Sequence, residues 1–180
     1  MQNLQCGVDQ MRPQVTIPFF RPSRRGFLSG AIAAIVGGSL LAAQRANAAE
    51  TVMTPPEAHK AALAGDIILV DVRTPQEWAE TGIGEGAIGL DMTQKPFVES
   101  LVKLRNLYPD KPIALICRTG NRSGYVFDAL TKQGFPGLVD VSEGMAGGPN
   151  GQGWIPRGLP TYPGTRDEIE KRLKDVMNPS

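Results

Sequence analysis

The chain of 180 residues is close to neutral, with 19 lysine and arginine residues against 18 aspartate and glutamate residues. This balance provides no basic surface of the kind that binds nucleic acid. Two cysteines and a single histidine are too few ligands for a structural zinc site, so we expect neither a metal nor another cofactor.

The first 48 residues have the pattern of an export signal. A basic segment containing Arg24 and Arg25 precedes an uncharged apolar stretch over residues 26–43, and the small residues Ala46 and Ala48 form a site that a signal peptidase accepts. The two arginines followed by a phenylalanine and a leucine resemble the twin-arginine signal. We therefore predict recognition by the export machinery and a periplasmic location.

An uncleaved membrane anchor is the alternative for this segment. The apolar stretch reaches the lower end of the ~20 residues that a membrane span needs, but its glycines and the cleavage site favour removal. The predicted division is a signal peptide over residues 1–48, cleaved near Ala48, and a domain over residues 49–180 that lies outside the membrane.

The predicted mature chain has the size of one domain and keeps one thiol. Residues 49–180 carry 14 basic and 17 acidic side chains, for a net charge of −3. Cys6 lies in the signal, so Cys117 has no partner for a disulfide within the chain. An unpaired cysteine in an exported protein is either a reactive thiol or a buried structural residue at a strand end.

Strand and helix signals alternate along the mature chain. A helix is predicted to begin after Thr54, which has capping-box spacing to Glu57, and a short helix opens at Pro75. The predicted strands cover residues 67–70, 87–90, 112–116 and 138–141, and the predicted helices cover residues 57–65, 75–78, 97–107, 122–134 and 165–177. This alternation predicts an α/β fold with a mostly parallel central sheet, and residues 144–153 form a glycine-rich loop.

The decisive segment runs from Cys117 to Ser123, between a predicted strand and a predicted helix. Ligands of open α/β sheets bind beyond the carboxyl ends of strands, often against a helix N-terminus. The free N–H groups of that helix and the guanidinium groups of Arg118 and Arg122 favour a negative charge on the sulfur. Gly120 permits a tight turn in which backbone amides converge on one point. We predict that Cys117 is a thiolate nucleophile.

The length of this loop distinguishes between two chemistries. Cysteine phosphatases place five residues between the cysteine and an arginine, whereas four residues separate Cys117 from Arg122. The tighter ring of amides suits one added sulfur atom better than a tetrahedral oxyanion. A cysteine phosphatase or arsenate-reductase-like enzyme remains the first alternative.

Further motifs stand in a fixed order around this loop. They are Asp71-Val72-Arg73 with Glu77-Trp78, Gly86-Ala87-Ile88, Glu143-Gly144-Met145, Gly153-Trp154 and Gly158-Leu159-Pro160. With the cysteine loop, they resemble the single-domain rhodanese sulfurtransferases over residues 51–160. Many members of that family have a histidine in the turn before the Gly-Ala pair, and this chain has none there.

The resemblance implies the rhodanese-like three-layer α/β/α fold and a double displacement. Cys117 takes a sulfane sulfur from a small-molecule donor such as thiosulfate, carries it as a persulfide and passes it to cyanide or a thiol acceptor. The backbone amides of the loop are expected to hold the transferred sulfur; these substrate-binding residues are Arg118, Thr119, Gly120, Asn121, Arg122 and Ser123. Arg118 and Arg122 are expected to attract an anionic donor, or one of them only braces the loop.

The other polar and aromatic residues are expected to have mainly structural roles. Asp71 and Arg73 are predicted to form a buried ion pair that joins a strand end to a helix, and His59 is expected to lie apart from Cys117. Trp154 either packs in the core or lines the mouth of the site. A sulfur carrier or regulatory module that meets a protein partner through the glycine-rich loop is an alternative of another class, and a redox-sensing thiol is a weaker one. The oligomeric state is left open.

Overall fold

The computed structural model describes residues 51–179, so the predicted signal peptide lies outside the described residues. The elements are α1 (Pro55–Ala64), β1 (Ile68–Asp71), α2 (Pro75–Thr81), β2 (Ile83–Gly84), β3 (Ala87–Gly89), α3 (Phe97–Leu107), β4 (Ile113–Ile116), α4 (Asn121–Lys132), β5 (Leu138–Asp140), β6 (Thr161–Tyr162) and α5 (Arg166–Met177). Apart from the two-residue strands β2 and β6, helices and strands alternate, as the sequence predicts. No helix among these residues has both the length and the apolar character needed to cross a membrane.

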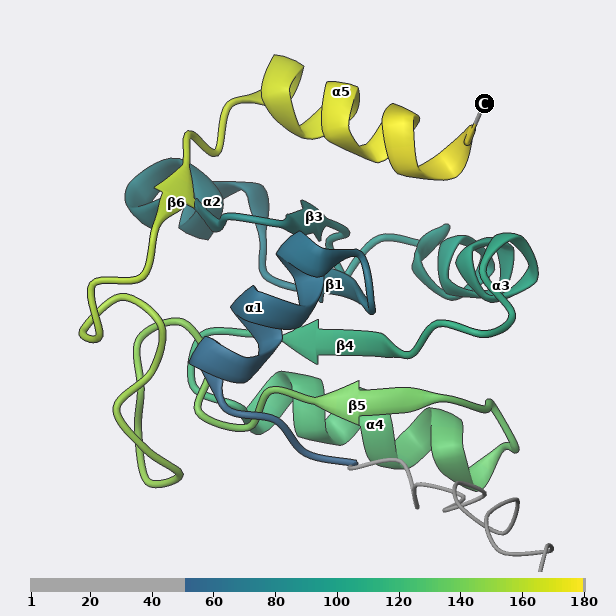
Figure 1. Cartoon of the computed structure of the whole chain (residues 1–180), viewed down its shortest axis with the longest axis horizontal. Helices are drawn as coiled ribbons and strands as arrows, with labels where there is room; N and C mark the ends of the chain where they lie inside the picture. The colour runs from purple at the N-terminus through teal and green to yellow at the C-terminus, as the bar shows by residue number, and fades with distance from the viewer. Residues whose placement is uncertain (1–50, 180) are drawn as a thin grey trace, which may run out of the picture. The chain divides into compact units, whose positions relative to one another are not determined.

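A four-stranded sheet forms the centre of the fold. Its strand order is β3-β1-β4-β5, and every neighbouring pair is parallel. Each parallel connection needs a crossover, which the helices between the strands provide. Figure 1 shows the four strands in this order, with α1 in front of the sheet and α4 behind β5. The predicted α/β fold with a mostly parallel sheet is therefore confirmed.

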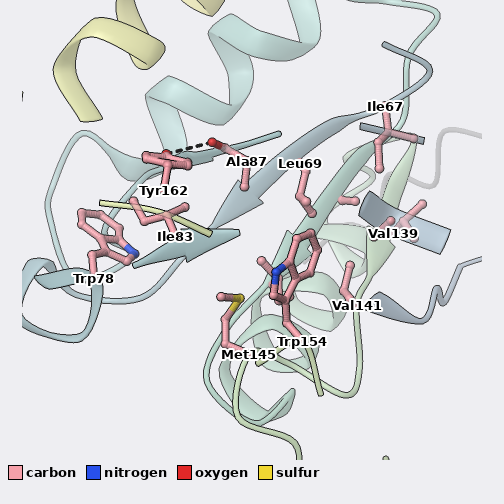
Figure 2. Close-up of a cluster of buried hydrophobic side chains, with 13 residues drawn as sticks. Ile67, Leu69, Trp78, Ile83, Ala87, Val139, Val141, Met145, Trp154 and Tyr162 are labelled. Atoms are coloured by element: carbon pink, nitrogen blue, oxygen red, sulfur yellow. Dashed lines mark hydrogen bonds between the residues drawn. The ribbon is translucent and has the colours of Figure 1, made fainter. Parts of the chain in front are cut away.

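The sheet is apolar on both faces because its strands are continuous apolar runs. Successive residues of a strand point to opposite sides, so Leu69 enters one core cluster and Val70 the other. One cluster includes Ala58 of α1 and Trp78 of α2 (Figure 2). The other includes apolar residues of α3 and α4, among them Leu101. Two helical layers thus enclose the sheet, which gives the expected three layers.

The helix starts follow local sequence rules. Thr54 precedes α1 and Thr74 precedes α2, and each forms a capping box with the glutamate three residues later. Proline occupies the first turn of both helices, where its missing N–H costs no hydrogen bond. Gly65 ends α1 in the left-handed conformation. These local signals explain why both helices begin where they were predicted to begin.

The sequence did not reveal the small antiparallel pair of β2 and β6. Ile83 pairs with Tyr162 and Gly84 with Thr161, which brings together two segments that are far apart in the sequence. The Tyr162 hydroxyl donates to the Ala87 carbonyl oxygen over 2.9 Å, which joins this pair to β3 (Figure 2). Strands of two residues have no periodicity to detect, so only the tertiary contacts define them.

The last helix, α5, lies on the surface, and none of its residues is fully buried. Its apolar side chains are partly covered, and Tyr108 donates its hydroxyl proton to the Val176 carbonyl oxygen over 2.8 Å. Arg172 stacks over the Tyr162 ring at 3.7 Å and pairs with Glu85 at 2.7 Å. The predicted amphipathic helix is confirmed, and specific polar contacts attach it to the fold.

Candidate active site

Cys117 follows β4 directly, at the carboxyl end of an inner strand. Three residues then lead into α4, which begins at Asn121, slightly earlier than the sequence suggested. Gly120 is the N-cap of this helix, and its φ of 88° lies in the left-handed region that glycine favours. The predicted position of the thiol between a strand end and a helix start is confirmed.

The sulfur atom lies within reach of two donors from the loop and α4. The Gly120 N–H donates to Cys117 Sγ over 3.2 Å, and Ser123 Oγ lies 3.6 Å from the same sulfur. Ser123 Oγ also lies 3.1 Å from the Gly120 carbonyl oxygen, so its single proton is shared between two acceptors. This arrangement can stabilise negative charge on the sulfur, as a nucleophilic thiolate requires.

Cys117 is nevertheless completely buried, with an exposed fraction of 0%. Its side chain belongs to the apolar cluster on the α3 and α4 face of the sheet. Burial agrees with the alternative of a structural cysteine, whereas the donors directed at the sulfur agree with a reactive one. In this conformation the Cys117 side chain has no surface in contact with solvent.

The glycine-rich segment packs against the back of the cysteine loop. The Met145 N–H donates to the Cys117 carbonyl oxygen over 2.8 Å, and the Ala146 N–H donates to the Arg118 carbonyl oxygen over 2.7 Å. A Cβ atom at Gly144 would lie 2.6 Å from that Arg118 oxygen, so a glycine is needed for the close approach. The segment that was predicted to be a loop therefore acts as a backing layer for the site.

An ion pair and a backbone hydrogen bond hold the two ends of the glycine-rich segment together. The Glu143 carboxylate is buried and accepts hydrogen bonds from Arg157 at 2.7 Å and from the Gly153 N–H at 2.9 Å. Glu143 and Gly153 belong to motifs that the sequence revealed, but Arg157 does not. The contact ties both ends of the glycine-rich segment together, and the cysteine loop rests on it.

Of the two loop arginines, Arg118 is the more exposed. Its side chain lines a small cavity of about 80 Å³ at the surface. The other residues that line the cavity are Arg73, Glu77, Glu80, Thr81, Met145, Ala146 and Ile155. Arg118 is thus in a position to meet an anionic donor that approaches from this side.

Arg122 is held by a carboxylate of another element. Its Nη1 donates to Glu77 Oε2 over 2.8 Å and its Nη2 donates to Glu77 Oε1 over 2.5 Å. The pKa of Arg122 is raised by these hydrogen bonds, against the effect of burial, and further by attraction to Glu77, Cys117 and Asp71. Arg122 thus joins α4 to α2 in the structure, and its predicted role in attracting an anionic donor stays a prediction.

The sequence identified Glu77 as part of a motif, but it did not indicate that Glu77 pairs with Arg122. The two residues are 45 positions apart, so no local spacing indicates the pair. The Glu77 carboxylate also accepts the Thr74 N–H over 3.1 Å within the capping box of α2. The hydrogen bonds from Arg122 lower the pKa of Glu77 to about 2, although partial burial acts in the opposite direction.

The predicted buried pair of Asp71 and Arg73 is present. The Arg73 side chain is 2% exposed, Asp71 is 0% exposed, and Nη2 lies 2.7 Å from Oδ2. Arg73 also donates to Thr81 Oγ1 over 2.8 Å and to the Gly82 carbonyl oxygen over 2.7 Å. The guanidinium therefore joins the end of β1 to the end of α2, as expected, and supports the helix that carries Glu77.

Asp140, at the end of β5, is a buried carboxylate that the sequence did not single out. Its Oδ1 atom has no hydrogen-bond partner in the structure, and burial is the main cause that raises the pKa of Asp140. A Cβ atom at Gly124, in the first turn of α4, would lie 3.5 Å from Asp140 Oδ2. The neighbouring strand thus brings a second acidic group close to the start of the helix that faces Cys117.

The two remaining candidates, Trp154 and His59, are part of the packing. Trp154 is completely buried (Figure 2), and its Nε1–H donates to the Pro160 carbonyl oxygen over 3.0 Å. The His59 ring meets Trp154 edge-on, with 5.2 Å between centroids. Trp154 therefore packs in the core. Within residues 51–179, no group of three histidine, cysteine or acidic side chains could hold a metal ion.

Comparisons with known proteins identify a family and several relatives. The family model of the rhodanese-like domain matches residues 54–148. An uncharacterized protein of Rickettsia prowazekii is 30% identical over 104 residues, which are 54% of this chain and 85% of that protein. A protein of Allochromatium vinosum named sulfurtransferase is 30% identical over 95 residues, which are 53% of this chain and 78% of that protein.

Among solved structures, the polysulfide-sulfur transferase homodimer of Wolinella succinogenes is 26% identical, with a TM-score of 0.47 and coverage of 64% of this chain and 80% of that chain. The family match and the relative named sulfurtransferase support sulfur transfer as the general activity. Because the family model matches residues 54–148, which are more than half of the sequence, the chain belongs to the rhodanese-like domain family.

Proposed function

We propose that the protein is a sulfurtransferase that carries sulfane sulfur on Cys117. The observation that carries this proposal is the position of Sγ beyond β4, where it accepts the Gly120 N–H at the start of α4. The free N–H groups and the dipole of that helix favour a negative charge at this point. The thiolate is the form of cysteine that attacks a sulfur–sulfur bond.

The proposed reaction has two displacements. Cys117 thiolate attacks the outer sulfur of thiosulfate, the S–S bond of the donor breaks, and sulfite leaves with the electron pair. The resulting persulfide is then attacked at its outer sulfur by cyanide or a thiolate acceptor, and Cys117 leaves as the thiolate. The loop amides from Arg118 to Ser123 would bind the outer sulfur, and Arg118 would attract the anionic donor.

The mass of the protein tests this proposal. Incubation with thiosulfate is expected to add one sulfur atom to the intact protein, and subsequent cyanide is expected to remove it and form thiocyanate. Cys117→Ser should abolish both steps, because a serine hydroxyl cannot hold a persulfide. Cys6→Ser in the full chain is the matched control and should behave as the wild type. A sulfur adduct that survives in Cys117→Ser would refute the assignment.

The complete burial of Cys117 favours one second candidate, a sulfur carrier or regulatory module whose loop opens only against a protein partner. Such a protein would accept sulfur but turn over slowly with cyanide. Steady-state thiocyanate production distinguishes the two: many turnovers support the enzyme, and a single turnover supports the carrier.

We also propose that residues 1–48 are a cleaved twin-arginine signal and that residues 49–180 act in the periplasm. The twin arginines, the diluted apolar stretch and the Ala46-x-Ala48 site support this proposal.

A further inference from the structure

Glu77 occupies the side of Arg122 that would otherwise be free to bind an anion. Both terminal guanidinium nitrogens donate to its two carboxylate oxygens, over 2.8 and 2.5 Å. A guanidinium binds carboxylate, phosphate or sulfonate groups with this same pair of nitrogens. An oxyanion that approaches the loop therefore has to compete with Glu77 for Arg122.

Two residues, Arg122 and Thr74, hold the Glu77 carboxylate in place. Besides the pair with Arg122, the Glu77 carboxylate accepts the Thr74 N–H over 3.1 Å and the Thr74 hydroxyl over 3.3 Å, as part of the capping box of α2. The Glu77 side chain is 16% exposed, against 35% for Arg122. With a pKa of about 2, Glu77 stays ionised throughout the neutral range, so protonation does not release the arginine.

The charges around the adjoining cavity balance in consequence. Arg118 and Glu80 line this cavity together with Glu77, and Glu80 is exposed. Glu77 pairs with Arg122 and Arg73 pairs with the buried Asp71, so Arg118 and Glu80 are the two charged lining residues that remain, one positive and one negative. This surface therefore provides little net electrostatic attraction for a dianionic donor. Binding of a monoanionic donor depends less on such attraction.

We propose that Glu77 is a specificity-determining residue that withholds Arg122 from anionic sulfur donors and so disfavours dianionic donors relative to monoanionic ones. This inference rests on the proposed sulfur transfer at Cys117. In both cases the Cys117 thiolate attacks the outer sulfur, the S–S bond breaks, and the oxidised sulfur group leaves with the electron pair. The donors differ in charge and in the group that leaves, so each donor is compared with itself between the wild type and the variants.

Two donors with the same reacting group provide the comparison. Thiosulfate is a dianion that releases sulfite, and benzenethiosulfonate is a monoanion that releases benzenesulfinate. Glu77→Gln removes the charge but keeps a side chain that can serve at this position of a capping box. The KM for thiosulfate should fall roughly two- to fivefold, as expected for release of a partly exposed ion pair. The KM for benzenethiosulfonate should fall by a smaller factor, with kcat little changed for both donors.

Glu80→Gln is the matched control, because it removes one negative charge from the same cavity without touching Arg122. It should change the KM for thiosulfate less than Glu77→Gln does. The inference is overturned if both variants lower the KM for thiosulfate equally, or if Glu77→Gln lowers the KM of both donors equally. The change in net charge of the cavity would then explain the result without Arg122. The double variant Glu77→Gln, Arg122→Gln should lose the gain, because no guanidinium remains to be released.

The opposite change gives an independent test if Glu77→Gln folds poorly. Arg122→Gln leaves the Glu77 charge uncompensated, so the KM should rise more for thiosulfate than for benzenethiosulfonate, and equal increases contradict the inference. Intact mass separates this inference from the proposed function. If the wild type gains no sulfur from either donor, sulfur transfer itself is refuted; if it gains sulfur but the variants leave the donor preference unchanged, only the role of Glu77 is refuted.

Discussion

Gly120 shows most directly how a single residue shapes the cysteine loop. Its φ is 88°, and a Cβ atom at this position would overlap the Ser142 carbonyl oxygen. The same oxygen accepts a hydrogen bond from Asn150 Nδ2 over 3.0 Å, so it cannot move freely away. Both the backbone conformation and the close approach therefore require glycine, and they place the Gly120 N–H on the sulfur.

Gly120→Ala is expected to destabilise the protein by about 2–4 kcal/mol. The left-handed conformation costs an alanine about 1 kcal/mol, and the overlap with Ser142 adds the rest. Gly134→Ala is the control, because Gly134 has a similar φ of 83° but an added Cβ atom there would have no other atom within 4 Å. Urea denaturation should show a loss of about 1 kcal/mol for the control. Equal losses for the two variants would mean that the contact with Ser142 is unimportant.

At the scale of elements, the buried Arg73 connects the end of β1 to the end of α2. It neutralises Asp71 and donates to two acceptors at the C-terminal end of the helix, on Thr81 and Gly82. Since α2 carries Glu77, the position of the Glu77 carboxylate beside the cysteine loop depends on this connection. The helix is short, and these polar contacts hold it together with the packing of the buried Trp78.

Arg73→Met should destabilise the protein by about 3–5 kcal/mol, because it leaves the Asp71 carboxylate buried without a partner. The double variant Asp71→Asn, Arg73→Met should recover part of this loss, since no buried charge then remains. Thermal and urea denaturation measure both. Arg166→Met breaks the exposed pair with Glu170 and is expected to change little. A loss for Arg73→Met no larger than that of this control would contradict the role of the buried pair.

At the scale of the whole molecule, the candidate site depends on elements that are far apart in the chain. The cysteine loop follows β4, its backing layer follows β5, and the residue that pairs with Arg122 comes from α2. These parts meet only after the parallel sheet has formed. The twin-arginine signal proposed above would export the domain with this site already assembled, because substrates of that class cross the membrane folded.

Replacing Arg24 and Arg25 together with lysine should therefore leave most of the precursor inside the cell. Cell fractionation and the intact mass of the periplasmic protein measure the effect, and the mature chain is expected to begin near Ala49. Replacement of Arg12 and Arg21 with lysine is the control and should not stop export, because these arginines lie outside the motif. Undiminished mature protein in the periplasm of the first variant would contradict a twin-arginine signal.

Much of the fold was predictable because its signals are local. Continuous apolar runs such as residues 113–116 indicate strands that are buried on both faces, and the threonine caps with proline and glutamate indicate the starts of α1 and α2. The pair of β2 and β6 was not predictable, because its strands have two residues each and lie far apart in the sequence.

For the site, the segment from Cys117 to Ser123 was predictable from the sequence, because these residues are neighbours in the chain. The order of strand end, Cys117, Gly120 and helix start predicted an amide donor close to the sulfur, and the structure has the Gly120 N–H there. Only the tertiary structure decided that Cys117 is buried, that Glu77 holds Arg122 and that Asp140 lies near the start of α4. The physical reason is that burial and long-range pairing depend on how the layers pack, and no spacing within one segment records that.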